Sequence, residues 1–158
     1  KSDNTFEESF KFVLPGYNVR PGELHGALGI EQLKKLPSLI ATRRKNAEFF
    51  VNQFRNHPFI SIQHEIGESS WFGFSMIIKK ESLLNRDQVI EILTKNGVEC
   101  RPIVSGNFLK NPVMKYYNYS VAGEIINADL IDSNGFFIGN HHYDLSTEIQ
   151  FLTTILKA

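Results

Sequence analysis

Polar side chains suited to binding an anion precede an apolar stretch near the start of this 158-residue chain. In GYNVRPGELHGALGIEQLKKL, residues 16–36, Asn18 and Arg20 stand just before a run with helical periodicity that begins at Pro21. The free amides of a helix start add donors, so the cluster suits a phosphate group, although a capped and solvated helix start has the same composition. His25 lies one turn further along, where it either faces the same pocket or packs at a subunit interface.

Two glycines interrupt the same predicted helix. Gly26 and Gly29 each cost about 1 kcal/mol relative to alanine in a helix interior. We interpret them as positions where another backbone comes close, and a second subunit is one source of that backbone. Residues 16–36 are therefore expected to form an interface segment.

Further candidate ligands lie in the second half of the chain. Arg101 is held extended by the following Pro102, and Asn107 ends a turn-like SGN stretch, so both side chains suit a cleft that binds hydroxyl or phosphate groups. A surface arginine and a turn asparagine explain the same residues equally well. His141 and His142 are adjacent, which points them to opposite faces of a strand and disfavours joint metal ligation. We predict no metal site and expect His141 to hydrogen-bond a ligand.

Composition narrows the classes of function. The chain is 42% hydrophobic with 13 Phe, enough for one sizeable core, and its 17 basic and 17 acidic residues cancel, which disfavours nucleic acid and anionic membranes as partners. No stretch is long and apolar enough to span a membrane, and the single Cys100 favours a reducing compartment such as the cytoplasm. No nucleophile or phosphate-loop signature is present, so no catalytic residue is predicted. The chain begins at Lys1 without Met, and we expect a piece of a longer protein.

Periodicity and punctuation predict a single α+β unit. The small sheet should be antiparallel or mixed, with helices mainly on one face. Phe72, Phe74, Met76 and Ile78 should share one face of a strand, and Pro37 should break the first long helix. The expected helices are 21–36, 37–55, 85–95, 122–133 and a last one capped by Ser146 and ending at Lys157. The expected strands are 59–63, 71–78, 98–104 and 136–139, and the strand 98–104 should lie at an edge of the sheet or at a strand end.

The stretch GYNVRPGELHGALGIEQLKKLPSLIATRRKNAEFF resembles the signature that follows the active-site region of the DegT/DnrJ/EryC1/StrS sugar-nucleotide aminotransferases, which are fold-type I pyridoxal phosphate enzymes. The resemblance implies that Asn18 reaches the cofactor phosphate in the partner subunit's active site. It also implies that the helix after it, with its glycines, helps to build a dimer interface.

Two further stretches, ECRPIVSGNFLKNPVMKYY and NGFFIGNHHYDLS, resemble the subgroup of sugar-nucleotide 3-dehydratases that act on GDP-4-keto-6-deoxymannose. This implies pyridoxal or pyridoxamine phosphate as cofactor and a nucleotide-linked keto sugar as substrate, for 3-dehydration or transamination. Under this reading Asn18 binds the cofactor, and the substrate-binding residues are Arg20, His25, Arg101, Asn107 and His141.

The same resemblance covers only the C-terminal part of the family's protein. Residues 1–158 are then expected to be the small domain, inactive alone, with the catalytic Lys or His upstream on an absent large domain. Its partners would be that domain and a second identical subunit. The alternative is a non-catalytic module of the same fold that serves dimerisation or sugar-nucleotide binding.

Overall fold

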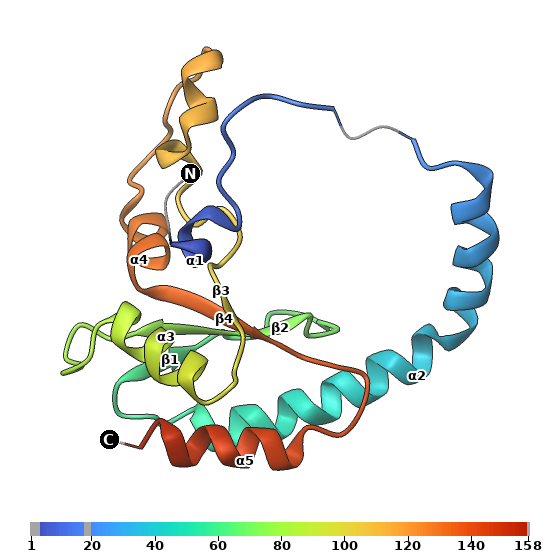
Figure 1. The fold of residues 1–158 in the computed structure, drawn as a ribbon, viewed down its shortest axis with the longest axis vertical. Helices are drawn as coiled ribbons and strands as arrows, with labels where there is room; N and C mark the ends of the chain where they lie inside the picture. The colour runs from blue at the N-terminus through green and yellow to red at the C-terminus, as the bar shows by residue number, and fades with distance from the viewer. Residues whose placement is uncertain (1–3, 18–19, 158) are drawn as a thin grey trace.

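The computed structural model describes residues 4–17 and 20–157, and Figure 1 shows the arrangement of their helices and strands. The helices are α1 (Thr5–Glu8), α2 (Glu23–Phe54), α3 (Arg86–Lys95), α4 (Ile126–Asn134) and α5 (Ser146–Ile155), with short 3-10 turns η1 (Phe108–Lys110) and η2 (Pro112–Tyr116). The strands are β1 (Ile60–Ile62), β2 (Gly73–Ile78), β3 (Cys100–Arg101) and β4 (Gly135–Gly139).

The strands of the described chain form one antiparallel sheet in the order β1-β2-β4-β3. In the centre Phe74 pairs with Ile138, and at one edge Cys100 pairs with the same Ile138. The antiparallel sheet confirms the predicted α+β class, and β3 is the edge strand that Pro102 indicated. Pro102 cannot donate to a ladder, so β3 ends just before it.

One face of the sheet carries the core. Helices α2, α3 and α5 pack on this face, and Figure 1 shows α5 lying along the C-terminal half of α2 below the sheet. Phe50 of α2 stacks on Phe74 of β2 with ring centroids 4.3 Å apart and on Phe54 at 4.8 Å. The buried side chains that join the layers include Phe50, Phe54, Phe74, Met76, Ile78, Val89, Leu93, Phe136, Ile138, Ile149 and Leu152.

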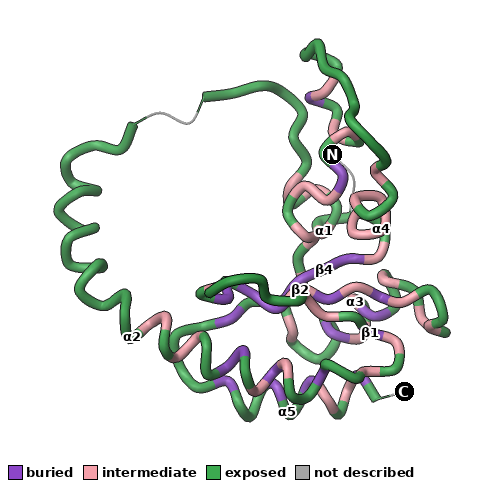
Figure 2. The backbone as a smooth tube through the Cα atoms, turned by 180° about the vertical axis from the view of Figure 1, so that it is seen from behind, coloured by how far each residue is buried: buried purple, intermediate pink, exposed green. Residues whose placement is uncertain are grey.

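Helix α2 runs unbroken from Glu23 to Phe54 with Pro37 inside it, so the predicted break at Pro37 is wrong. Proline removes one backbone donor and crowds the preceding turn, which kinks a helix without always ending it. Figure 1 shows α2 changing direction along its length, so its N-terminal half extends away from the sheet. Residues 21–38 are all exposed (Figure 2).

Three local predictions also need correction. Phe74, Met76 and Ile78 are buried together as expected, but Phe72 is 71% exposed because β2 begins only after it, at Gly73. Helix α4 starts at Ile126, four residues later than predicted, since Gly123 has a φ of +73° that a helix cannot accommodate. Ser146 is the first residue of α5 rather than its cap, and its N–H donates to Asp144 Oδ1 at 2.9 Å.

The capping prediction for α3 is confirmed. Asn85 Oδ1 accepts the Gln88 N–H at 3.0 Å while the Gln88 side chain accepts the Asn85 N–H at 2.9 Å. The chain leaves the helix at Gly97, whose φ is +78°. Within the described residues, no helix has both the length and the apolarity of a membrane span.

Candidate functional site

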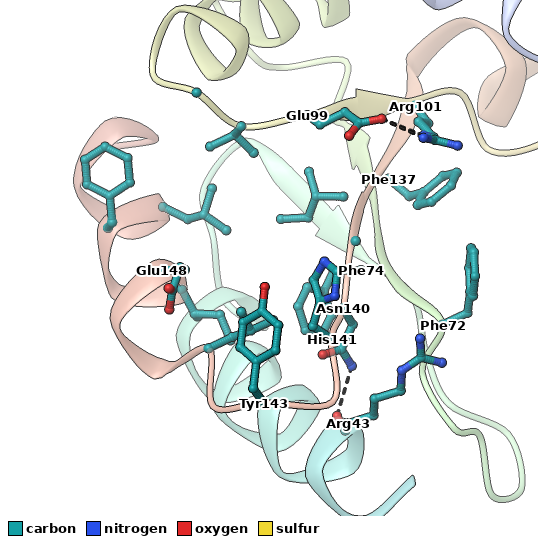
Figure 3. A pocket seen from close by; sticks show the side chains of 18 of the residues that line it. Arg43, Phe72, Phe74, Glu99, Arg101, Phe137, Asn140, His141, Tyr143 and Glu148 are labelled. Carbon is teal, nitrogen blue, oxygen red and sulfur yellow. Dashed lines mark hydrogen bonds and ion pairs between the residues drawn. The ribbon is translucent and has the colours of Figure 1, made fainter. Parts of the chain in front are cut away.

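A cavity of about 880 Å³ opens where β3, the end of β4 and the start of α5 meet (Figure 3). It brings together two of the predicted ligand residues, Arg101 and His141, which are 40 positions apart in sequence. Aromatic rings and a few charged groups line it, a composition typical of small-molecule sites. The side chains that line it include Arg43, Phe72, Glu99, Arg101, Phe137 and His141.

The strand register places a row of residues on the sheet face opposite the core. Arg101 of β3 pairs directly with Phe137 of β4, so the two side chains share a face. Gly139 lies two residues beyond Phe137 and therefore on the same side. His141 follows after two more residues, and its Nε2 lies 4.0 Å from the position of a Cβ on Gly139. The cavity wall is thus built by β3 and β4.

Arg101 is held by a carboxylate on its own strand edge. Its Nε and Nη2 both donate to Glu99 Oε1, at 2.9 and 2.7 Å. Both side chains remain largely exposed, so the pair contributes little to stability but holds the guanidinium at the cavity wall (Figure 3). The remaining N–H groups of the guanidinium suit a phosphate.

Two buried asparagines hold the cavity's lower wall in place. Asn46 of α2 and Asn140 at the end of β4 are each 3% exposed, and Asn46 Nδ2 donates to Asn140 Oδ1 at 3.1 Å. Asn140 Nδ2 donates to the carbonyls of Arg43 at 3.0 Å and Trp71 at 2.9 Å. Asn46 also donates to the carbonyls of His141 and Tyr143 and accepts the Leu145 N–H.

This buried pair therefore ties α2 and the entry of β2 to loop 140–145. Sequence reasoning missed it, although two asparagines next to core-facing apolar positions were a visible signal. Buried amides are expected to be hydrogen-bonded, and here their partners are backbone groups of the segments that carry the cavity's aromatic rings.

Aromatic rings form much of the wall. His141 stacks on Tyr143 with ring centroids 5.0 Å apart. Phe72 lies 6.0 Å from the Phe137 ring, and the Arg43 guanidinium carbon lies 5.9 Å from the Phe72 centroid. Such rings offer flat surfaces for a planar or sugar-like ligand, and the arginine adds positive charge.

Asn107 does not line this cavity. It is 3% exposed, its Nδ2 donates to Asp129 Oδ1 at 2.9 Å, and its Oδ1 accepts the Leu109 N–H at 3.1 Å. Lys110 and Asn107 lower the pKa of the Asp129 carboxyl through hydrogen bonds. Asn107 therefore joins η1 to α4, and its predicted contact with substrate stays a prediction.

The extended N-terminal half of α2, which carries His25, contributes none of the residues that line the cavity, and Figure 1 shows it leading away from the sheet. His25 Nδ1 accepts the Gly22 N–H at 3.2 Å, so the imidazole caps its own helix. Arg20 is exposed, and Asn18 lies outside the described residues. The predicted roles of these three residues stay predictions.

The glycines in this half of α2 have no structural explanation within the described chain. A Cβ on Gly26 or Gly29 would meet no other atom of these residues within 4 Å. Around them, Leu24 is 74% exposed, Ile30 63% and Leu33 66%. Five apolar side chains on one short stretch are left uncovered by the described residues: Leu24, Leu28, Ile30, Leu33 and Leu36.

Comparison with known proteins places these features in a wider group. A sequence profile of the DegT/DnrJ/EryC1/StrS aminotransferase family matches residues 1–151. The chain is 60% identical over 158 residues to a GDP-4-keto-6-deoxy-D-mannose 3-dehydratase of Escherichia coli, covering 99% of this chain and 41% of that protein. It thus spans about two fifths of that relative's length.

Solved structures of related proteins also match this chain. A structure of the E. coli 3-dehydratase with bound hydrated pyridoxal phosphate matches with a TM-score of 0.84 and 60% identity, over 99% of this chain and 41% of that one. A mutant GDP-4-keto-6-deoxymannose-3-dehydratase with bound GDP-perosamine matches with a TM-score of 0.85 and 60% identity, over the same shares of the two chains.

Proposed function

Because the chain belongs to the DegT/DnrJ/EryC1/StrS aminotransferase family, we propose that residues 1–158 are the C-terminal small domain of a pyridoxal or pyridoxamine phosphate enzyme that acts on a nucleotide-linked 4-keto sugar. The observation that carries the proposal is the 60% identity to a GDP-4-keto-6-deoxy-D-mannose 3-dehydratase over 99% of this chain. This favours 3-dehydration, the removal of a sugar hydroxyl, over transamination.

Within such an enzyme, the cavity wall supplies substrate contacts. Arg101 pairs with a phosphate of the nucleotide, and His141, which lines the same cavity, donates a hydrogen bond to a phosphate or sugar oxygen. The GDP-perosamine bound in the solved relative supports a ligand that carries both groups. Arg20 and His25 act at a second place on the chain, at the start of α2.

The cofactor contact assigned to this chain is small. Asn18 is proposed to bind the cofactor phosphate, and the adjoining Arg20 and the start of α2 are exposed, so they are accessible to an anion. Pyridoxal or pyridoxamine phosphate supplies, when bound, an electron sink for bond breaking next to the keto carbon. The chain's own residues hold the phosphate and orient the sugar nucleotide.

The extended half of α2 is proposed to pack against a second identical subunit and the large domain. Its apolar side chains are exposed, and its two glycines leave room for a close backbone. The lone Cys100 favours work in the cytoplasm.

Mass spectrometry of the reaction of the full-length protein tests the proposal. With pyridoxal phosphate, glutamate as amino donor and GDP-4-keto-6-deoxymannose, the expected product lacks the 3-hydroxyl oxygen. If the main product is an amino sugar, the reaction is transamination and not dehydration. A full-length protein that neither retains the cofactor nor converts the sugar would leave the non-catalytic module as the function.

A further inference from the structure

Gly139 is the exposed last residue of β4, and neither a positive φ nor a close contact within the described chain requires a glycine there. Its φ lies outside the left-handed region, because it is absent from the glycines with positive φ. A Cβ built on it would touch only His141 Nε2, at an ordinary contact distance of 4.0 Å. Gly139 is still paired with Gly73 across the ladder, and a glycine in a paired strand often marks a place where a ligand or another backbone approaches closely. Here the open space lies in front of the cavity wall.

The surface around Gly139 is aromatic. Phe137 and His141 flank it along the chain, and Gly73 pairs with it across the sheet. The Phe137 ring covers Gly73, since a Cβ there would lie 2.9 Å from Phe137 Cδ2. Gly139 is thus the bare part of a patch of the cavity wall with rings at its borders.

Phe72 forms the remaining border of the patch, and the residue before it has a strained backbone conformation. Trp71, which precedes it, has a φ of +50°, an uncommon conformation for a bulky residue. Hydrogen bonds hold this conformation: the Trp71 N–H donates to Ser69 Oγ at 2.9 Å, and its carbonyl accepts from Asn140 Nδ2 at 2.9 Å. Strain of this kind concentrates at ligand sites, and here it precedes a phenylalanine left 71% exposed at the cavity.

Positive charge lies at both ends of the patch. The Arg43 guanidinium lies 5.9 Å from the Phe72 centroid, and Arg101 shares the sheet face with Phe137. A patch with aromatic rings and two arginines matches the chemistry of a nucleoside diphosphate, whose base stacks and whose phosphates pair with guanidinium groups.

We propose that Gly139 is the floor of a base subsite: the planar base of the nucleotide packs on its bare backbone against Phe72, while Arg101 binds the diphosphate. This assignment rests on the proposed function and goes beyond it, because it names the part of the substrate that each residue contacts. Any side chain at position 139 would occupy the space of the base.

Calorimetric titration of the full-length protein tests the subsite with two probes, GDP and inorganic pyrophosphate, which lacks a base. Gly139→Val should weaken GDP binding about tenfold or more and leave pyrophosphate affinity within about twofold. Phe72→Leu should weaken GDP binding about 5-fold to 150-fold, the range for loss of one base–aromatic stack, and Phe72→Tyr should restore it. Ser61→Val is the matched control, because it adds the same side chain at an exposed position of β1 and should change neither affinity.

The outcomes separate the subsite from the function. If Gly139→Val binds GDP with wild-type affinity, or loses GDP and pyrophosphate binding equally, the base assignment is wrong. The proposed function still stands in that case if the wild-type enzyme retains its cofactor and converts its substrate. If Gly139→Val fails to fold, wild-type GDP affinity in Phe72→Leu overturns the base assignment instead. A wild-type protein that binds neither cofactor nor GDP refutes the proposed function, and the subsite falls with it.

Discussion

Replacing the buried Asn46 by aspartate reverses the polarity of one atom without changing the size of the side chain. Asn46 Nδ2 faces three oxygens: Asn140 Oδ1 at 3.1 Å, the His141 carbonyl at 3.2 Å and the Tyr143 carbonyl at 2.8 Å. Its Oδ1 accepts the Leu145 N–H at 3.2 Å. Asn46→Asp keeps this acceptor but turns the donor into a second carboxylate oxygen among other oxygens.

The magnitude follows from the number of protons. The amide has two N–H protons to share among its three acceptors and accepts one further bond, so Asn46→Ala removes about three net hydrogen bonds. At about 1 kcal/mol each, this loss destabilises the protein by about 3 kcal/mol. The loss in Asn46→Ala should not depend on pH.

Asn46→Asp adds a dependence on pH whose sign is fixed by the site. Burial and the facing oxygens disfavour the charged carboxylate, so its folded pKa rises above the unfolded value of about 3.9. A group whose pKa is raised on folding contributes its stability below the unfolded pKa and loses it as the pH rises through the folded pKa. Asn46→Asp should therefore be least stable at pH 8 and recover in acid, where its O–H donates one bond.

Thermal melts of the full-length protein from pH 4.5 to 8, with hydrogen exchange at the Leu145 amide, measure both effects. The stability difference between Asn46→Ala and wild type at each pH serves as the control. Both proteins carry all the other titratable groups, so the pH dependence of those groups cancels in the difference. An Asn46→Asp curve that runs parallel to the Asn46→Ala curve at every pH would show that the amide does not face the three oxygens.

Three further predictions concern groups outside this pair. Burial lowers the pKa of His57, against the raising effect of its hydrogen bond to the Leu156 carbonyl. The free energy of unfolding should therefore fall as the pH drops below about 6.5, the unfolded value. Urea titrations at pH 8 and pH 5 should show a smaller loss of stability in His57→Gln than in wild type. Burial, aided by the Glu99 carboxylate, raises the pKa of the Cys100 thiol to about 12, so at pH 8 a thiol reagent should label the folded protein far more slowly than the urea-denatured protein. Asn85→Ala should cost about 1 kcal/mol in urea titrations because it removes the cap of α3, whereas Asn85→Gly should cost only a few tenths.

Local signals predicted the elements well where the deciding contacts lie within a few residues. The cap at Asn85, the stop at Gly97 and the buried alternation of Phe74 and Met76 all depend on neighbours up to four positions away. Pro37 misled for the same reason, because the sequence shows the missing donor but not the continuation of the helix on both sides.

The site depended on contacts across the chain. Sequence alone picked out Arg101, Asn107 and His141 as polar groups in suitable segments, but the antiparallel register of β3 and β4 decided that Arg101 and His141 share a cavity. Asn107 instead donates a hydrogen bond to Asp129, outside this cavity.

Residue types and their spacing thus determined the family resemblance, the α+β class and most element positions, because helix and strand periodicity is written over short distances. Only the tertiary structure decided which polar groups meet. Asn46 and Asn140, 94 positions apart, form the buried pair that holds the cavity wall. No local pattern encodes such a pair, because its partners are fixed by how the layers pack.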